Sequence, residues 1–150
     1  MSVNFEVKRT IKASQQHVYR SLFDLDAARN WMQGFVRIER LDDGPVQIGS
    51  KWLETRKMFG KEATEHFEVV ELNGTDKVVL CCDGTKGTTG KGEFVYTYTL
   101  VSSGEETEVT LNGEINGLTG LTKLFGKLMV GTFSKVCAKD LDALKSYLEN

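Results

Sequence analysis

The stretch that decides the fold is residues 119–149, which read TGLTKLFGKLMVGTFSKVCAKDLDALKSYLE. It contains no proline and its apolar residues recur at helical spacing, so it predicts one long helix. At about 1.5 Å per residue this helix is roughly 45 Å long, whereas a compact chain of this size has a radius of gyration of roughly 15 Å. The helix must therefore cross the whole domain.

The apolar stripe of this helix changes side near its middle. In the first half the stripe comprises Leu121, Phe125, Leu128 and Thr132. In the second half it lies about 130° further round the helix and comprises Phe133, Cys137, Leu144 and Leu148. We therefore predict that Gly131 marks either a bend or a change of contact face, as expected of a helix laid across a strongly curved sheet.

The residues before the helix indicate an antiparallel sheet. Residues 3–11 alternate apolar and polar side chains, which predicts a half-buried strand. Ser14 is the expected N-cap of a short helix, and a second short helix is expected from Asp26 to Met32. From Phe35 to Ile115, short apolar or alternating segments separated by turn residues predict about six more strands. The expected fold is α+β, with a curved antiparallel sheet of about seven strands that grips the C-terminal helix and two short helices after strand one.

The composition is that of one globular domain, which we expect to span residues 1–150. Hydrophobic residues make up 40% of the 150 residues and charged residues 27%, values that exclude intrinsic disorder. A net charge of -2 gives no general attraction to phosphate backbones or anionic lipid, although it leaves room for a local basic patch. Nucleic acid is therefore not an expected partner.

The N-terminal segment argues against export. Glu6, Lys8 and Arg9 occupy positions where a secretory signal needs apolar residues. No run in the chain approaches about 18 uncharged apolar residues, the length that a membrane-spanning helix needs. We expect a cytoplasmic protein that does not insert into membranes.

One predicted strand carries aromatic residues on the side that should face the helix. If the sheet curls round the final helix, the inward set is Phe94, Tyr96, Tyr98 and Leu100. The two tyrosine hydroxyls then need hydrogen-bond partners, which a ligand, a water molecule or a neighbouring side chain would supply. Ligand contact and ordinary core packing are both open interpretations of this pattern.

In a second predicted strand, which carries Trp52, either of the two sides fits the interior. In one phase the inner side comprises Trp52, Glu54, Arg56 and Met58, so two charges enter the interior and must be paired. Such a pair lining a wet cavity would indicate function. The opposite phase, with Leu53 and Phe59 inside, fits the pattern nearly as well.

Neither the histidines nor the cysteines form a metal-binding pattern. His17 lies in a polar helical stretch and is expected to face solvent. His66 is either a general base in the cavity or, more simply, a surface histidine between carboxylates. Adjacent Cys81 and Cys82 point to opposite faces of any strand, so no metal site is expected, and with Cys137 they are expected to be reduced thiols.

The glycine-rich residues 84–92, GTKGTTGKG, resemble a phosphate-binding loop in composition only. The Gly-Lys pair is followed by Gly92 and not by Ser or Thr, and the spacing of the first glycine is wrong. We expect a mobile hairpin connection at the mouth of a cavity instead of a nucleotide site.

Two motifs resemble those of a known family. The opening Val7-x-x-x-Ile11-x-Ala13-Ser14-x-x-x-Val18-Tyr19-x-x-Leu22-x-Asp24 with Trp31 beyond it, and the later Ile48-Gly49-Ser50-Lys51-Trp52, resemble the SRPBCC superfamily of START-related, helix-grip proteins. The resemblance covers essentially the whole chain. It implies a cavity between sheet and helix, which some relatives use to carry lipids or other hydrophobic molecules and others use for polyketide cyclisation or dehydration.

We therefore expect the protein to bind or transport a small hydrophobic molecule, lipid or polyketide-like, without a cofactor. The candidate ligand-binding residues are Trp52, Arg56, Tyr96, Tyr98, Phe125, Leu128, Met129 and Phe133. One alternative is a cyclase or dehydratase-type enzyme, in which Tyr96, Arg56 or His66 polarises a carbonyl or moves a proton. Another alternative is an interaction module whose sheet surface binds a protein.

Overall fold

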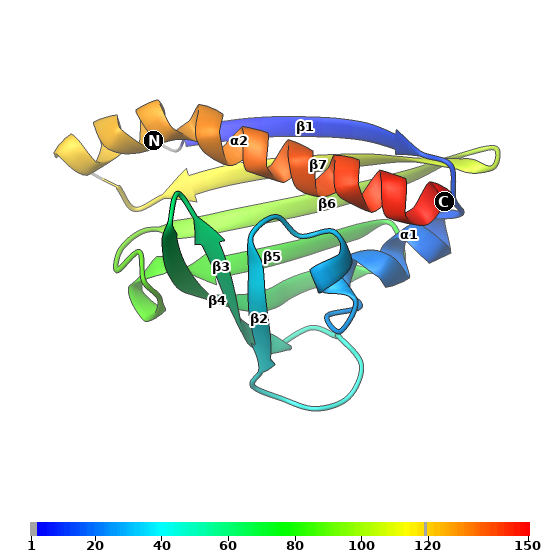
Figure 1. Ribbon diagram of the computed structural model, residues 1–150, viewed down its shortest axis with the longest axis horizontal. Helices are drawn as coiled ribbons and strands as arrows, with labels where there is room; N and C mark the ends of the chain where they lie inside the picture. The colour runs from blue at the N-terminus through cyan, green and yellow to red at the C-terminus, as the bar shows by residue number, and fades with distance from the viewer. Residues whose placement is uncertain (1–2, 119) are drawn as a thin grey trace.

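The computed structural model describes residues 3–118 and 120–150, apart from the side chains of residues 121, 122 and 125 (Figure 1). The elements in chain order are β1 (Val3–Ile11), α1 (Gln15–Leu22), η1 (Ala28–Asn30), β2 (Phe35–Arg40), β3 (Lys51–Met58), β4 (Lys61–Asn73), β5 (Lys77–Asp83), η2 (Gly84–Lys86), β6 (Glu93–Ser103), β7 (Glu106–Asn116) and α2 (Gly120–Glu149). These are the predicted curved sheet and long C-terminal helix.

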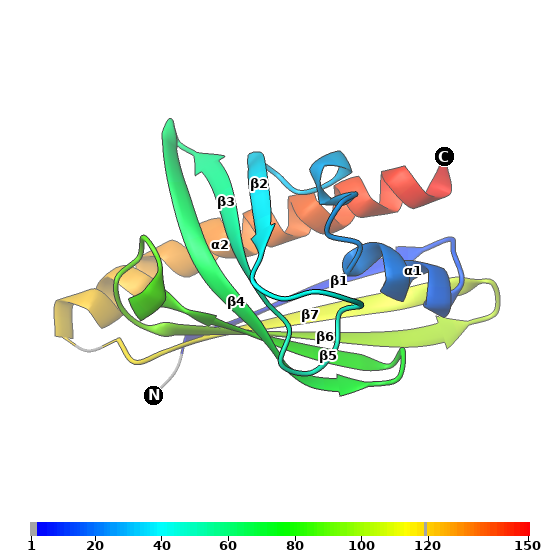
Figure 2. The same cartoon turned by 90° about the horizontal axis from the view of Figure 1, so that it is seen from below.

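The sheet is antiparallel throughout, with strand order β1-β7-β6-β5-β4-β3-β2. Consecutive strands from β2 to β7 are neighbours, and the first strand joins the last, so that Val7 pairs with Leu111. Figure 2 shows the sheet curving strongly, with β2, β3 and β4 turned away from the direction of β6 and β7. This curvature lets one face of the sheet wrap around α2.

Two short helical segments follow β1, as predicted. The first, α1, begins after Ser14, whose hydroxyl accepts a hydrogen bond from the backbone N–H of His17 at 3.2 Å. The second is shorter than the predicted range of Asp26 to Met32, because only η1 forms, as a single 3-10 turn of 3 residues. Buried Val18 of α1 and Trp31 after η1 join the core.

The long helix presents one continuous face to the protein. Its buried and half-buried side comprises Gly126, Phe133, Cys137, Leu141 and Leu144, all within one stripe of a 3.6-residue period. Leu124 and Leu128 lie on the opposite side and are 55% and 73% exposed. The predicted change of contact face at Gly131 is therefore wrong, because Leu124 and Leu128 in the first half of the helix point into solvent and not toward the sheet. A bend at Gly131 stays a prediction.

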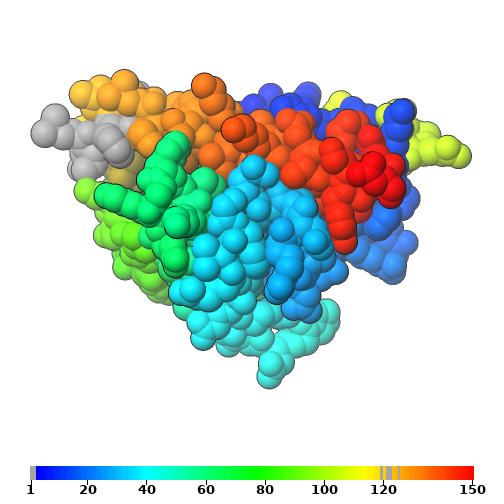
Figure 3. Space-filling model, viewed as in Figure 1, coloured from blue at the N-terminus to red at the C-terminus, as the bar shows by residue number. Residues whose placement is uncertain are grey.

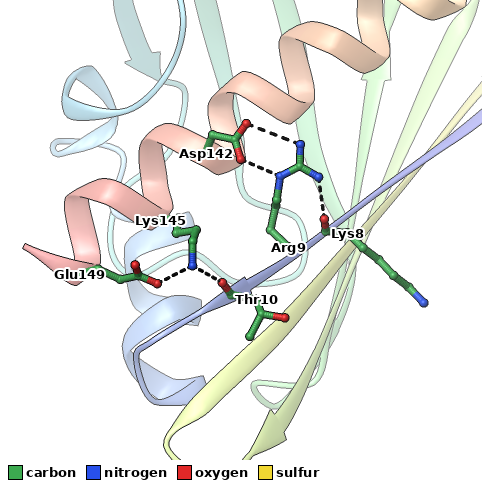
Figure 4. Close-up of polar contacts among 6 residues, drawn as sticks. All are labelled: Lys8, Arg9, Thr10, Asp142, Lys145 and Glu149. Carbon is green, nitrogen blue, oxygen red and sulfur yellow. Dashed lines mark hydrogen bonds and ion pairs between the residues drawn. The ribbon is translucent and has the colours of Figure 1, made fainter.

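Polar contacts hold the second half of α2 on β1 (Figure 4). Arg9 Nε lies 2.6 Å from Asp142 Oδ1, and Lys145 Nζ donates to the carbonyl oxygen of Thr10 at 2.6 Å. Lys145 also pairs with Glu149 at 2.7 Å. The helix is thus tied to the sheet near its C-terminal end, where Leu141 and Leu144 reach the fully packed core.

In the view of Figure 3, the side chains of α2, β2 and the hairpin of β3 and β4 form one continuous surface. Among the described residues, no helix has the length and apolar character needed to cross a membrane.

Candidate functional site

The inner face of the sheet is fixed by the alternation of side chains along each strand. On β3, Trp52 and Glu54 are 2% and 7% exposed, whereas Leu53 between them is on the other face. The strand therefore adopts the phase that brings Glu54 and Arg56 inside. The opposite phase, with Leu53 and Phe59 inside, is wrong, and Phe59 is 82% exposed.

Aromatic rings form a row across this inner face. Trp52 of β3 stacks on Phe67 of β4 with ring centroids 6.0 Å apart, and Phe67 lies 6.1 Å from Tyr96 of β6. Their strands are linked by the register, in which Trp52 pairs with Phe67. The row continues to the edges of the interior, where Tyr98 meets Phe23 edge-on and Phe94 meets Phe133 of α2.

Burial differs along this inner face. Leu100 of β6 and Leu144 of α2 are only 2% and 0% exposed. Tyr96 and Tyr98 are half-buried, and burial raises the pKa of both hydroxyls. The cavity expected between this strand and α2 stays a prediction. We call the predicted space next to Arg56, Phe67, Tyr96, Tyr98 and Phe133 the inner hollow.

A buried ionic triad lies at one side of the inner hollow. Arg56 Nε donates to Glu54 Oε2 at 2.8 Å and Nη1 donates to Asp140 Oδ2 of α2 at 2.8 Å. Asp140 Oδ1 also accepts the backbone N–H of Gln33 at 2.7 Å, which fixes the carboxylate. The side chains of Arg56, Glu54 and Asp140 are 20%, 8% and 11% exposed. The guanidinium is the most accessible member and the one with capacity for a further acceptor.

The charges of the triad are coupled. Burial lowers the pKa of Arg56, but the carboxylates of Glu54 and Asp140 outweigh this effect and raise it above the ordinary value. Burial raises the pKa of Asp140, and the guanidinium opposes that rise. Arg56 therefore stays charged, because the two neighbouring carboxylates stabilise its protonated form.

Most of the predicted site residues come together. Those on the inner face are Trp52, Arg56, Tyr96, Tyr98 and Phe133, while Met129 lies one turn before Phe133 and is half-buried. Leu128 does not belong to this set, because it points outward from α2 and is 73% exposed. The side chain of Phe125 lies outside the described residues. Contact of any of these residues with a ligand stays a prediction.

The sequence reasoning missed Asp140, which supplies the second carboxylate to Arg56. A signal for it exists in the sequence, since Asp140 lies on the same helical stripe as Phe133, Cys137 and Leu144. An acidic residue on an apolar stripe predicts a buried cation opposite it. Phe67 was also missed, because its place in the aromatic row depends on the pairing of β4 with β3.

The indole of Trp52 adds an unsatisfied group to this region. Its Nε1 is buried, and none of the described residues accepts its hydrogen bond. A buried donor without an acceptor costs about 1–3 kcal/mol, so an acceptor from water or ligand would stabilise it.

Several other candidates lie away from the inner hollow. His66 alternates with Phe67 on β4 and therefore faces the outer side of the sheet, where it pairs in register with Asp83. It cannot act as a base inside. His17 is exposed as predicted. Cys81, Cys82 and Cys137 are free thiols. Within the described part of the chain, no group of His, Cys, Asp and Glu side chains could hold a metal ion.

The glycine-rich residues 84–92 join β5 to β6, as expected of a hairpin connection. They are tied to β4, because the backbone N–H of Thr88 donates to the carbonyl oxygen of Thr64 at 2.8 Å and the hydroxyl of Thr89 donates to Glu65 at 2.6 Å. The mobility of this connection stays a prediction.

Comparison with known proteins identifies relatives of this fold. Residues 2–149 match the family model described as "Polyketide cyclase / dehydrase and lipid transport". No curated protein matches the sequence significantly. Among solved structures, the Zhui aromatase/cyclase from a Streptomyces species superimposes with a TM-score of 0.82 at 15% identity, over 99% of this chain and 94% of that one.

Proteins from other organisms share the same architecture. The ginseng major latex-like protein 151 from Panax ginseng has a TM-score of 0.81 at 11% identity, over 98% of this chain and 97% of that one. A protein of unassigned function from Rhizobium leguminosarum has a TM-score of 0.75 at 16% identity, over 99% and 95% of the two chains. At these identities the likeness shows the fold alone.

Proposed function

The chain belongs to the polyketide cyclase / dehydrase and lipid transport family, within the SRPBCC superfamily, and from this premise we propose that it binds a small apolar molecule carrying one polar group in the inner hollow. The family's range covers both ligand binding and cyclase-type roles. The residues of this chain favour binding with a fixed orientation, because one end of the inner hollow is apolar and aromatic while the other holds a single accessible cation.

The observation that carries the proposal is the position of Arg56 beside the aromatic row. Its guanidinium is held at 2.8 Å by both Glu54 and Asp140, so its direction does not depend on a ligand. Among the described residues, no group is hydrogen-bonded to its Nη2 atom. A preorganised donor of this kind suits a carbonyl or hydroxyl oxygen, because it binds the oxygen without losing further side-chain freedom.

The tyrosines extend the polar side of the site. Because burial raises the pKa of Tyr96 and Tyr98, both hydroxyls stay protonated and act as hydrogen-bond donors at neutral pH. Phe67 and Phe133 then provide contact area for the apolar body of the ligand. The expected ligand has a flat or extended hydrocarbon body and an oxygen acceptor near one end.

Two fluorescent probes of similar size test this proposal. Anthracene offers hydrocarbon only, whereas 6-propionyl-2-dimethylaminonaphthalene carries a ketone. Replacing Tyr96 by Phe should weaken the ketone probe by roughly 2- to 10-fold, the equivalent of one hydrogen bond of about 0.5–1.5 kcal/mol, and leave anthracene unchanged. Tyr147→Phe, at a residue 43% exposed on α2, is the matched control and should affect neither probe.

Native mass spectrometry of the purified protein provides an independent test, since a retained molecule appears as a mass that denaturation removes. No saturable binding of either probe, together with no retained mass, would refute the proposal. If Tyr96→Phe weakened the binding of both probes equally, Tyr96 would contribute packing and not a hydrogen bond.

A second candidate function, cyclisation or dehydration of a polyketide-like ketone, has one specific observation in its favour. A ketone hydrogen-bonded to Arg56 would lie next to the carboxyl of Asp140, which could exchange a proton with the neighbouring carbon. Incubation with an acyclic poly-β-ketone and detection of an aromatic product by absorbance would test it. Product formation that Arg56→Gln and Asp140→Asn both abolish would support an enzyme. Binding without product would leave the carrier function.

A further inference from the structure

One five-residue pattern occurs twice in the chain. Residues 57–61 read KMFGK and residues 123–127 read KLFGK, so each has two lysines around an apolar pair and a glycine. The first copy forms the turn between β3 and β4, and the second lies in the first half of α2. Residues 84–92 add two more lysines, Lys86 and Lys91. None of these three segments contains an acidic residue.

The three segments lie toward one end of the molecule. In Figures 1 and 2 the β3–β4 turn, η2 and the start of α2 all lie toward the same end, away from the C-terminus. Thr88 is hydrogen-bonded to Thr64, near the start of β4. Gly92 lies against Leu118, and Leu118 in turn lies against Gly126 of α2. Contacts thus connect the glycine-rich connection to β4 and to the helix.

Large apolar side chains of this end lie in the solvent. Phe59 is 82% exposed, and Leu124 and Leu128 are 55% and 73% exposed. Phe59 also has a φ of 52°, in the left-handed region that a bulky residue rarely adopts. Asparagine or glycine would serve this turn with less strain, so Phe59 contributes little to the stability of the fold.

The charge of this end is positive and unpaired, although the whole chain carries -2. Within the described residues, none of Lys57, Lys61, Lys86, Lys91, Lys123 and Lys127 takes part in an ion pair. Three acidic residues, Glu62, Asp83 and Glu93, directly flank these segments in sequence, against six lysines within them. The local charge of this end is therefore net positive.

From the combination of exposed apolar side chains and unpaired lysines we infer that this end of the molecule docks on the surface of an anionic lipid bilayer. We call it the basic end, defined by residues 57–61, 84–92 and 123–128. Lysines attract anionic headgroups, while Phe59, Leu124 and Leu128 enter the interfacial layer. A nucleic acid or an acidic protein would use the lysines but would leave an isolated phenylalanine at a turn without a role. The docking does not depend on the proposed ligand.

Vesicle flotation with the full-length protein tests this inference. We expect binding to vesicles of phosphatidylcholine mixed with phosphatidylserine, weak binding to phosphatidylcholine alone, and loss of binding in high salt. The double variant Lys123→Gln, Lys127→Gln should lower the partition coefficient roughly 25-fold, at about 5-fold for each lysine. The matched control is Lys8→Gln, Lys139→Gln, which removes two exposed lysines outside the basic end and should have little effect.

A second pair of variants tests the apolar contribution. Phe59→Asn suits the left-handed backbone, so it should fold at least as well as the wild type while losing vesicle binding several-fold. Ile48→Asn removes a comparably exposed residue, 61% exposed, from the loop before β3 and should bind as the wild type does.

Three results would overturn the inference: no binding to anionic vesicles, equal binding to neutral vesicles, or equal losses in the basic-end variants and their controls. The inference would also be overturned if a single-stranded oligonucleotide competed with the vesicles and Phe59→Asn bound that oligonucleotide as tightly as the wild type. The surface would then recognise polyanions in general. The same variants should bind the ketone probe unchanged, so failure of docking and failure of ligand binding are separate results.

Discussion

Removal of the cation from the buried triad is the sharpest test of how the interior is held together. Arg56→Met keeps an unbranched apolar stem at this position, but Glu54 and Asp140 lose the guanidinium that each contacts at 2.8 Å. Two carboxylates, 8% and 11% exposed, would then face each other without a counter-charge. Breaking a buried pair costs about 3–5 kcal/mol. Because Arg56 is itself 20% exposed, we expect the lower end of this range, about 3 kcal/mol.

The surface pair of Figure 4 is a matched control with the same chemistry. Arg9 contacts Asp142 at 2.6 Å, but these side chains are 34% and 56% exposed. Solvent screens such a pair, so Arg9→Met should cost less than about 1 kcal/mol. A larger cost for Arg56→Met would then reflect the burial of its pairs and the second carboxylate that Arg56 contacts.

Acidification should shrink the cost of Arg56→Met. Burial already raises the pKa of Asp140 in the wild type, and loss of the opposing guanidinium raises it further. A carboxyl whose pKa is higher in the folded state binds its proton more tightly there than in the unfolded chain. The variant therefore gains stability relative to the wild type as the pH falls from neutrality toward the ordinary carboxyl pKa.

Urea unfolding followed by tryptophan fluorescence would measure these effects, because Trp31 and Trp52 are 4% and 2% exposed and become solvated on unfolding. A loss of about 3 kcal/mol corresponds to a fall in the melting temperature of roughly 6–12 °C. The reasoning is refuted if Arg56→Met costs no more than Arg9→Met, or if its cost is independent of pH.

Three further predictions follow from packing and burial. Gly113→Ala should destabilise the protein by about 1–3 kcal/mol, because a Cβ there would overlap the ring of Phe5, and Phe5→Leu should recover part of the loss in the same urea assay. Burial raises the pKa of Cys82 and raises that of Cys137 to about 12, so thiol titration at mildly alkaline pH should find both unreactive until the protein is unfolded. Leu128→Ala should change the free energy of unfolding by less than about 0.5 kcal/mol, since its side chain lies in solvent.

Much of the fold follows from the sequence because its signals are local. Alternation in residues 3–11, the Ser14 cap and the proline-free residues 119–149 each specify an element without reference to the rest of the chain. The inner orientation of Tyr96 and Tyr98 also follows from alternation on one strand. Each of these predictions depends on a period of 2 or 3.6 residues that one segment displays by itself.

The remaining features depend on contacts between distant segments. The phase of Trp52 was ambiguous because Arg56 can enter the interior only if Asp140, from the last helix, neutralises it. Leu128 was misplaced because a stripe of apolar residues shows which residues share a side of a helix, but not which side the sheet covers. The outward position of His66 follows from Phe67 only once β4 is paired with β3.

The union of the first and last strands has a consequence for the order of folding. Val7 pairs with Leu111, so β1 has no place in the sheet until nearly all of the chain exists. At about 5–20 residues per second, a ribosome takes roughly 5–20 s to make the intervening 100 or so residues. During that time consecutive strands from β2 onward can pair with each other as they are made, while β1 has no partner strand. Closure of this edge is a long-range step, and it should limit the rate at which the native state appears.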